Sequence, residues 1–356
     1  MKSEIRITRS KELKPHPKDK ELGFGQFFTD HMFVMDYSPQ SGWSDPRIEP
    51  YGAFPIEPAA MVFHYGQAIF DGMKAYRSAK GTIHLFRPHK YLSRLNESAR
   101  RVCIPEVDTE FVLDALKVLI GIERGWIPNS REASLYIRPF IIATDSALGV
   151  RASRTYRFFI ILSPVGAYYP EGFKPVKIFI TTKYVRAVRG GVGEAKTSGN
   201  YAASLLASEE AKKLGFTQVL WLDAIERRFI EEVGTMNIFV KLGDELATPA
   251  LSGSVLSGIT RDSVIRFCRD RGIRVSERPI SIDEVIEAHK SQTLKEVFGS
   301  GTAAVISPVS ELWYSDQRFI INDGEVGETA AMLYDEITAI QYGLNPDPYG
   351  WIMELQ

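Results

Sequence analysis

The stretch RGGVGEAKTSGN, residues 189–200, decides how the rest of the sequence is interpreted. From Gly190 onward it differs by one residue from the phosphate-binding loop pattern G-x-x-x-x-G-K-[ST]. A predicted strand at 175–182 precedes it, and a predicted helix at 200–214 follows it. That loop needs glycine directly before the lysine, where its amides close around a phosphate, but Ala195 stands there. The sequence therefore disfavours a nucleotide-binding loop.

Lys196 follows Ala195 and precedes Thr197, Ser198 and Gly199, which are all small. Small neighbours let a flat ligand approach the backbone, so this lysine is placed for covalent chemistry. The ordinary alternative is a solvated surface lysine, which is the usual fate of this residue type. Both interpretations stay open on these residues alone.

The composition describes a globular protein with a substantial core. The chain has 356 residues, of which 44% are hydrophobic and 24% charged, and its net charge is −1. This balance argues against a nucleic-acid or membrane-surface role. The two cysteines, Cys103 and Cys268, lie far apart and indicate a reducing compartment. The sequence has no apolar run of about 18 residues and no secretory signal at its start, so we expect a cytoplasmic protein without a membrane segment.

The chain reads as a mixture of helices and strands in both halves. In the first half, a predicted strand at 81–87 is followed by predicted helices at 89–102 and 109–125 and then by predicted strands at 133–143 and 156–164. The segment PVGAYYPEGFKP, residues 164–175, is rich in proline and glycine and is the best candidate boundary. We expect a smaller α+β domain at 1–165, a linker at 166–175 and a larger domain at 176–356.

Two further positions carry chemical information. Glu232 precedes a Val-Gly-Thr-Met-Asn turn; if it is buried, it needs a cationic partner, whereas an ordinary strand-edge acid is the alternative. Tyr136 and Arg138 alternate with apolar residues, which places both on one face of a strand. An arginine facing an apolar site is costly unless it binds an anion, although it could also extend to solvent.

Collinear blocks along nearly the whole chain resemble one family. GEAKTSGNYAASLLASEEAKKLGFTQVLWLD (193–223) and EEVGTMNIFV (231–240) are similar to the class IV pyridoxal-phosphate enzymes and, within them, to the branched-chain amino-acid aminotransferases. The other blocks are FFTDHMFVMDY (27–37), VFHYGQAIFDGMKAYR (62–77), HLFRPHKYLSRL (84–95), SLYIRPFIIATDSALGV (134–150) and EVFGSGTAAVISPV (296–309). The resemblance implies a mixed α+β and α/β protein with the two-domain fold type IV, which is D-amino-acid aminotransferase-like.

The resemblance implies pyridoxal 5'-phosphate as cofactor and a role for each matching residue. Lys196 matches the lysine that forms the Schiff base, and Glu232 matches the partner of the pyridine nitrogen, which keeps the ring an electron sink. Tyr201 matches the tyrosine that hydrogen-bonds the phenolic oxygen. The residues that match phosphate contacts are Arg87, Ile259, Thr260 and Thr302. No metal is expected.

The resemblance also implies the substrate contacts. Phe28, Tyr65 and Phe70 match apolar walls, and Arg138 beside Tyr136 matches the group that binds the side-chain carboxylate of glutamate or 2-oxoglutarate. The substrate α-carboxylate is expected to meet backbone N–H groups near Thr302 and Ala303. Val150 ends the segment SALGV, which resembles the loop that closes the pocket of a neighbouring subunit, so a homodimer is implied.

The implied reaction is reversible transamination of L-leucine, L-isoleucine and L-valine with 2-oxoglutarate, which gives branched 2-oxo acids and L-glutamate. A D-amino-acid aminotransferase or an aminodeoxychorismate lyase of the same fold is the nearest alternative, and a non-catalytic phosphate- or nucleotide-binding module is the alternative from another class. One departure concerns regulation. Some animal members carry C-x-x-C after the Gly-Thr of GSGT, whereas this sequence has Ala304 and Ser307, so no thiol switch is expected there.

Overall fold

The computed structural model describes residues 4–168 and 172–355. The chain folds into two compact units. The first comprises Met1–Pro170, Ala195–Ser198 and Ala339–Gln356, and the second comprises Glu171–Glu194 and Gly199–Thr338. The linker expected at 166–175 includes residues 169–171, which lie outside the described residues. The expected mixed helix and strand content is confirmed, and each unit contains its own sheet.

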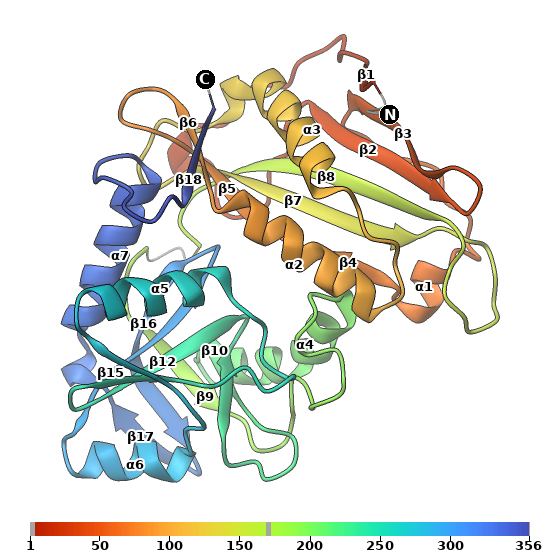
Figure 1. The fold of residues 1–356 in the computed structure, drawn as a ribbon. Coiled ribbons are helices and arrows are strands. Elements are labelled where there is room, and N and C mark those ends of the chain that lie inside the picture. Colours follow the sequence, from red (N-terminus) through yellow and green to blue (C-terminus); the bar gives the residue numbers. More distant parts are fainter. Residues whose placement is uncertain (1–3, 169–171, 356) are drawn as a thin grey trace. The chain divides into compact units, whose positions relative to one another are not determined.

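The first unit is built on a mainly antiparallel sheet (Figure 1). The strands pair in the order β1-β3-β2-β8-β7-β5-β6-β18, and β4 also pairs with β7. Their bounds are β1 (Arg6–Ile7), β2 (His31–Ser38), β3 (Gly42–Pro50), β4 (Ala68–Phe70), β5 (Met73–Arg77), β6 (Ile83–Phe86), β7 (Ser134–Ala143), β8 (Tyr156–Val165) and β18 (Ile352–Leu355). Since β18 pairs antiparallel with β6, the end of the chain completes the sheet that its first half begins.

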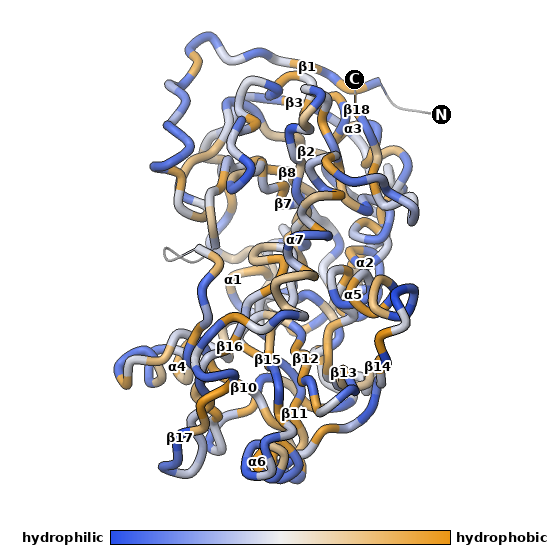
Figure 2. Tube along the Cα trace, turned by 90° about the vertical axis from the view of Figure 1, so that its left-hand side faces the viewer, coloured by the Kyte–Doolittle hydropathy of each residue, from blue (hydrophilic) through white to orange (hydrophobic). Residues whose placement is uncertain are grey.

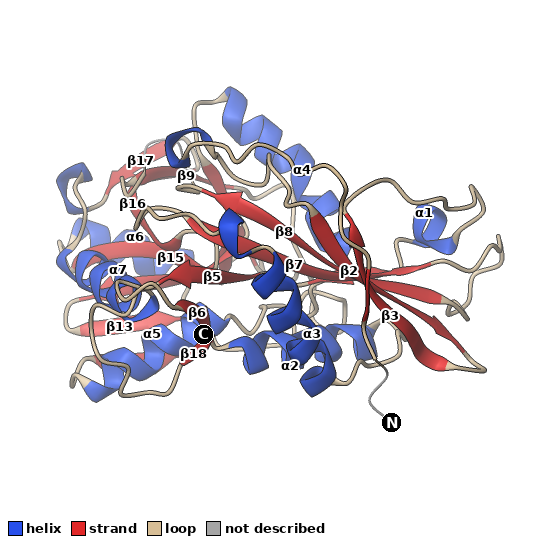
Figure 3. Cartoon of the chain, turned by 90° about the horizontal axis from the view of Figure 1, so that it is seen from above, coloured by secondary structure: helices blue, strands red, loops and turns tan. Residues whose placement is uncertain are grey.

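Helices α2 (Pro88–Arg101) and α3 (Thr109–Ile122) cover one face of this sheet, as Figure 3 shows. Helix α2 begins with Pro88 at its first position, where a missing N–H costs nothing. Asp108 caps α3, since its side chain accepts hydrogen bonds from the N–H groups of Glu110 and Phe111. A short helix α1 (Met61–Tyr65) and the 3-10 turns Asp19–Glu21 and Arg124–Trp126 complete the described elements of this unit.

The second unit contains a mixed sheet whose strand order is β11-β10-β9-β16-β15-β12-β13-β14, with β17 paired to β16. The bounds are β9 (Val176–Ile180), β10 (Gln218–Leu222), β11 (Ile230–Val233), β12 (Met236–Leu242), β13 (Glu245–Thr248), β14 (Arg274–Glu277), β15 (Leu294–Gly301), β16 (Val305–Tyr314) and β17 (Gln317–Ile320). Because β11 also pairs with β12, the strands from β11 to β12 close into a ring. The β11–β12 hairpin is therefore the seam of a barrel-like sheet.

Helices α5 (Ile259–Asp270) and α6 (Ile282–Lys290) belong to the second unit, together with the 3-10 turn Asn322–Gly324. Helices α4 (Ser198–Lys213) and α7 (Glu328–Gln341) each carry residues of both units. In Figure 2 the segment between β1 and β2 is largely hydrophilic, whereas hydrophobic colour runs along many of the strands. No helix in the described part of the chain is both long and apolar enough to cross a membrane.

Candidate active site

Lys196 is held by the backbone of the first unit. The N–H of Phe70 donates to the carbonyl of Lys196 at 3.1 Å, and Ile69 forms a β-bridge with Thr197. The N–H of Lys196 itself donates to the Ser98 hydroxyl of α2 at 2.9 Å. These bonds place the segment Ala195–Ser198 against strand β4, although the chain on either side of it belongs to the second unit. The lysine backbone is therefore fixed by long-range pairing.

The surroundings of Lys196, which is partly buried, lower the pKa of its amine to about 8. Removal from water is the main cause and the positive charge of Arg94 adds to it, whereas the carboxylate of Asp71 opposes the shift. The Lys196 ammonium nitrogen lies 4.8 Å from the ring centroid of Phe70. A lysine with a lowered pKa carries a larger fraction of free amine near neutral pH, and the free amine is the nucleophile.

Asp71 and Arg94 form a buried ion pair beside this lysine. Arg94 Nε lies 2.9 Å from Asp71 Oδ2, and Arg94 Nη2 lies 2.6 Å from Asp71 Oδ1, so the pair is bidentate. The sequence analysis missed both residues. A signal existed, because Arg94 stands between Leu92 and Leu95 on the buried face of α2. A charged residue on the apolar face of a helix needs a buried partner.

Phe70, Tyr136 and Arg138, which are predicted substrate contacts, lie close to one another. The guanidinium carbon of Arg138 lies 4.6 Å from the ring centroid of Phe70 and 5.2 Å from that of Tyr136. Arg138 Nη2 donates to the Tyr136 hydroxyl at 3.1 Å, and Arg138 Nε is buried without a hydrogen-bond partner among the described residues. A Cβ at Gly72 would collide with the Tyr136 hydroxyl, so glycine allows this close approach.

A buried lysine, Lys74, lies on the same face of the first sheet as Tyr136. Lys74 of β5 pairs with Tyr136 of β7, which in turn pairs with Ser163 of β8. Residues opposite each other across strands share a face, so these three polar side chains form a row. Burial lowers the pKa of Lys74 to about 8. Lys74 was not predicted from the sequence. Strand β5 is buried on both faces, so no alternation of buried and exposed residues marks this position.

The remaining predicted wall residues have other neighbours within the first unit. The ring of Phe28 stacks on Tyr51 with a centroid distance of 5.0 Å. The hydroxyl of Tyr65, at the end of α1, donates to the carbonyl of Leu148. Val150, in the same loop as Leu148, is 84% exposed. The structure therefore connects Tyr65 with the loop that carries Leu148 and Val150.

Glu232 lies on β11 in the second unit and is buried. Its Oε2 lies 2.9 Å from Arg186 Nε, and its Oε1 accepts hydrogen bonds from the N–H of Leu256 at 2.9 Å and from Asn237 Nδ2 at 3.3 Å. An ion pair and these donors favour the ionised carboxylate. Asn237 stands opposite Glu232 across the β11–β12 seam. The hairpin therefore fixes both the position and the charge of this acid.

Arg186 is a partner of Glu232 that the sequence did not reveal. It lies in the loop after β9, and its Nη2 donates to the carbonyls of Gly193 and Ser254. These bonds aim the guanidinium at Glu232. The predicted need for a cationic partner of Glu232 is therefore met, within the second unit, by an arginine of this chain.

Ile259 and Thr260 are the first residues of helix α5. The N-cap is Gly258, which has no side chain with which to cap the helix. Such a helix start favours an anion, because its first N–H groups point outward and the helix dipole is positive there. Thr302 and Ala303 lie in the turn between β15 and β16, which are hydrogen-bonded neighbours. The same turn ends at Val305, whose φ of 62° is strained for a β-branched residue.

Arg87 lies in the first unit, directly before α2. Its φ of 51° and ψ of 43° are left-handed, which is unusual for a residue with a Cβ. Its guanidinium carbon lies 5.5 Å from the ring centroid of Trp351, and its N–H donates to the Trp351 carbonyl at 2.6 Å. Tyr201, in contrast, lies in the first turn of α4 and belongs to the second unit.

The predicted residues are thus divided between the units. The first unit holds Phe28, Tyr65, Phe70, Arg87, Tyr136, Arg138, Val150 and Lys196, and the second holds Tyr201, Glu232, Ile259, Thr260, Thr302 and Ala303. The first unit holds a partly buried lysine near a cation, and the second unit holds a buried carboxylate and the start of helix α5. In the described residues no group of acidic, histidine and cysteine side chains could hold a metal ion.

Comparisons with known proteins agree with this chemistry. Residues 68–312 match the family model of class IV amino-transferases. The chain is 57% identical to branched-chain-amino-acid aminotransferase 2 of Bacillus subtilis (strain 168), over 99% of this chain and 98% of that protein. The solved structure of the branched-chain amino acid aminotransferase of Escherichia coli has a TM-score of 0.76 at 26% identity and covers 91% of this chain and 98% of that one.

A second solved structure is a branched-chain amino acid aminotransferase of the organism abbreviated T.th., complexed with N-(5'-phosphopyridoxyl)-L-glutamate. It has a TM-score of 0.72 at 26% identity and covers 90% of this chain and 97% of that one. Sequence identity and fold agree over almost the full length, and the family model covers residues 68–312. These matches show that the chain belongs to the class IV aminotransferases and, within them, to the branched-chain-amino-acid aminotransferases.

Proposed function

We propose that the protein transfers the amino group of L-leucine, L-isoleucine or L-valine reversibly to 2-oxoglutarate, with pyridoxal 5'-phosphate as cofactor. The observation that carries this proposal is the partly buried Lys196, whose lowered pKa raises the fraction of neutral amine beside Phe70 and near the positive charge of Arg138. The relative solved with a phosphopyridoxyl compound joined to glutamate supports both the cofactor and one substrate.

The residues of each unit fit this cofactor. In the first unit, Lys196 supplies an amine that can bond to an aldehyde, and Arg87 supplies a cation for a phosphate. In the second unit, Glu232 supplies the ionised acid that a pyridinium nitrogen requires, and the uncapped start of α5 suits a phosphate. When bound, the cofactor supplies an electron-withdrawing ring that stabilises negative charge at the substrate α-carbon.

The side chains then have defined tasks. Lys196, as a neutral amine, would accept the proton from the substrate α-carbon and hold it for the return transfer, which is general acid–base catalysis. Arg186 and Asn237 hold Glu232 ionised and oriented. Arg138 binds the second carboxylate of glutamate, whereas the ring of Phe70 accommodates aliphatic side chains. One site can therefore accept two kinds of side chain in turn.

We further propose that the active form is a cytoplasmic homodimer. Leu148 and Val150 are apolar and are 69% and 84% exposed in the single chain, and Leu205 of α4 is 62% exposed. Large apolar side chains at such exposure favour burial against another protein surface. We expect the partner to be a second copy of this chain, since closed twofold dimers are the commonest oligomers.

The test is a half-reaction with each amino acid in the absence of a 2-oxo acid, followed by the absorbance of the bound cofactor. We expect L-leucine, L-isoleucine, L-valine and L-glutamate each to convert the cofactor to its amino form. D-alanine is included because it separates this function from that of a D-amino-acid aminotransferase. Conversion by D-alanine alone would overturn the proposal.

A further inference from the structure

The second unit contains a cavity beside the strand that carries Glu232. Successive residues of a strand point to opposite faces, so Glu231 and Glu232 of β11 face different surroundings. Glu231 lines a cavity of about 160 Å³. None of the residues that line it is among the predicted cofactor or substrate contacts.

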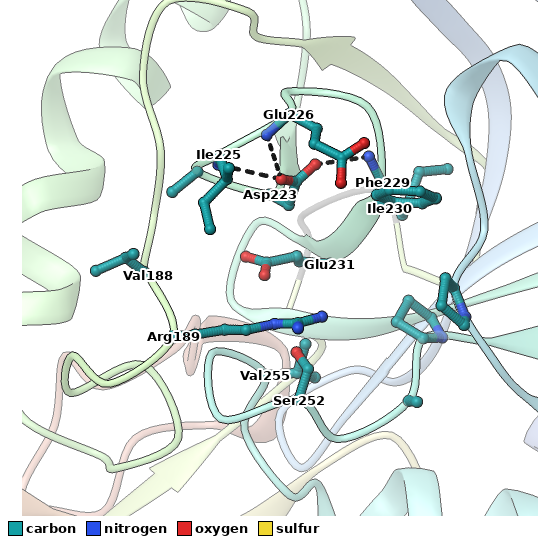
Figure 4. Close-up of a pocket in the computed structure, with 14 residues that line it drawn as sticks. Val188, Arg189, Asp223, Ile225, Glu226, Phe229, Ile230, Glu231, Ser252 and Val255 are labelled. Atoms are coloured by element: carbon teal, nitrogen blue, oxygen red, sulfur yellow. Dashed lines mark hydrogen bonds between the residues drawn. The ribbon is translucent and has the colours of Figure 1, made fainter.

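The walls of this cavity are mainly apolar. They come from the loop after β9, the segment between β10 and β11, and the segments that follow β13 and β14. The apolar lining residues are Val188, Ala224, Ile225, Phe229, Ile230, Pro249, Ala250, Val255 and Pro279. Figure 4 shows the Glu231 carboxylate between the Asp223 loop and the side chain of Arg189. The cavity therefore offers an apolar enclosure around one central acid.

Glu231 is a polar group that its own surroundings satisfy only in part. The residue is 6% exposed, and its Oε1 accepts a hydrogen bond from the Ser254 hydroxyl. Its Oε2 is buried and has no hydrogen-bond partner among the described residues. Burial raises the pKa of Glu231, while Ser254 and the charges of Arg186 and Arg189 oppose that shift. An unsatisfied buried acceptor is costly, and a donor supplied by a ligand removes the cost.

The other charged groups around the cavity have different roles. Both carboxylate oxygens of Asp223 accept backbone N–H groups of its own loop, from Ile225, Glu226, Arg228 and Phe229, at 2.7–3.1 Å. Asp223 therefore shapes the wall. Arg189 and Glu226 are exposed residues at the mouth. The acceptor that remains for a ligand is Glu231 Oε2, and Arg189 is a cation of the cavity lining whose charge acts on that acid.

We propose that this cavity binds a small molecule that carries a protonated amine on an aliphatic body. The ammonium group donates a hydrogen bond to Glu231 Oε2, and the aliphatic body contacts side chains such as Val188 and Val255. Free aliphatic amino acids and simple aliphatic amines share this chemistry. In an amino acid the carboxylate additionally meets Arg189 at the mouth. The inference stands independently of the proposed transamination.

The probe for the test is N,N-dimethyl-3-methylbutylamine, a tertiary amine that cannot form an imine and so cannot react with an aldehyde. Its binding to the full-length holoenzyme is measured by isothermal titration calorimetry at neutral pH. We expect one site per chain, and a loss of at least about tenfold in affinity in Glu231→Gln, since a hydrogen bond to a charged group is lost. The control is Glu226→Gln at the mouth, which should bind as the wild type does.

A second variant keeps the test valid if Glu231→Gln fails to fold. Val188→Trp fills the cavity from the opposite wall and leaves the Glu231 side chain unchanged, and it should abolish binding of the same probe. The uncharged alcohol 3-methylbutan-1-ol should bind far more weakly than the amine. An affinity for the amine that is unchanged by both Glu231→Gln and Val188→Trp would overturn the proposal, as would no detectable binding of the amine to the wild type.

The two sources of the ligand are separated by competition. L-leucine is added to holoenzyme that has first been reduced with borohydride, so that reaction at the lysine-bound cofactor is blocked. Displacement of the tertiary amine by L-leucine supports the cavity and identifies an amino acid as its ligand. Displacement by 3-methylbutylamine but not by L-leucine supports the cavity and identifies a simple amine. Displacement by neither contradicts the proposal.

Discussion

At the residue scale, the chemistry of the site depends on what surrounds a buried charge. Lys74 is buried and Lys196 is partly buried, and the pKa of each is lowered to about 8, mainly by removal from water. They differ in their neighbours, because Lys196 lies in the field of the Asp71–Arg94 pair and against the ring of Phe70. Candidate roles for Lys196, Glu232 and Arg138 could be proposed from the sequence. Their partners Arg94 and Arg186 could not, because a partner is defined only once distant segments meet.

The first prediction concerns the cost of burying Lys196. Its folded pKa of about 8 lies below the usual value of 10.5, so the unfolded chain holds a proton between these pH values that the folded chain has lost. The cost is thus complete below pH 8 and disappears as the pH rises towards 10.5. In cofactor-free protein, Lys196→Met should raise the free energy of unfolding by about 3 kcal/mol at neutral pH.

Urea unfolding of the two cofactor-free proteins at several pH values measures this difference. The gain should shrink steadily as the pH rises through that window. Lys90→Met is the control, because Lys90 is an exposed lysine of α2 and its replacement should leave stability nearly unchanged. A gain for Lys196→Met that does not depend on pH would contradict the lowered pKa.

The second prediction concerns Arg138. Arg138→Met should raise the KM for glutamate and 2-oxoglutarate by roughly tenfold or more, since one charge-assisted contact is lost, and should change the KM for leucine much less. Steady-state kinetics with each substrate measures the ratio. Arg157→Met is a matched control, since Arg157 lies on the neighbouring strand β8, on the same face of the sheet, and pairs with Asp36. Equal losses for glutamate and leucine would show that Arg138 does not discriminate.

At the element scale, the periodic segments were predictable and their ends were not. The helices expected at 89–102 and 109–125 correspond to α2 and α3, with α3 ending at Ile122 before a separate 3-10 turn. Helix α4 begins at Ser198, two residues earlier than expected, directly after the bridge of Thr197 to Ile69. That bridge pairs residues far apart in sequence. Local propensity carries no information about it.

Two strained backbone positions were also beyond sequence-based prediction. Arg87 and Val305 both have a positive φ. Arg87 is itself a predicted phosphate contact, and Val305 ends the turn that contains another, Thr302. Strained residues of this kind persist only where the surrounding structure holds them, and they collect at functional sites. Arginine and valine do not favour a positive φ, so their residue types could not predict one. The left-handed conformation of Arg87 before α2 was therefore found only in the structure.

The third prediction concerns the start of helix α3. Asp108 accepts hydrogen bonds from the N–H groups of Glu110 and Phe111 at 3.0 and 3.1 Å, so Asp108→Ala should lower the free energy of unfolding by about 1 kcal/mol. Chemical denaturation measures the change. Asp108→Asn keeps a cap of similar strength and should recover most of the loss. If the alanine and asparagine variants were equally unstable, the cap would not be the cause.

At the whole-molecule scale, the sequence predicts a protein of two parts but not how the chain is shared between them. The first unit takes up Ala195–Ser198 and the C-terminal segment Ala339–Gln356, although most of the chain between them belongs to the second unit. Both assignments rest on long-range backbone pairs, such as the pairing of β18 with β6. The closure of the β11–β12 seam is of the same kind. Register of this sort is set by packing rather than by local pattern.

The fourth prediction concerns the proposed homodimer. Sedimentation equilibrium should give about twice the 40.0 kDa mass of the chain. If Val150 closes the pocket of the partner subunit, Val150→Asp and Lys196→Ala should each be nearly inactive alone. After mixing and reassembly, about a quarter of the wild-type sites should be active, because half of randomly formed dimers carry one intact site. A monomer, or no recovery after mixing, would contradict this arrangement.

The central claim is that one particular lysine bonds to the cofactor, and the most direct measurement is peptide mass spectrometry after borohydride reduction of the holoenzyme. Lys74 is the internal competitor, since its pKa is lowered to about 8 as that of Lys196 is, although it is more deeply buried than Lys196. The account predicts that the peptide containing Lys196 carries the phosphopyridoxyl group and that the peptide containing Lys74 does not. The group on Lys74, on any other residue, or on none would contradict it.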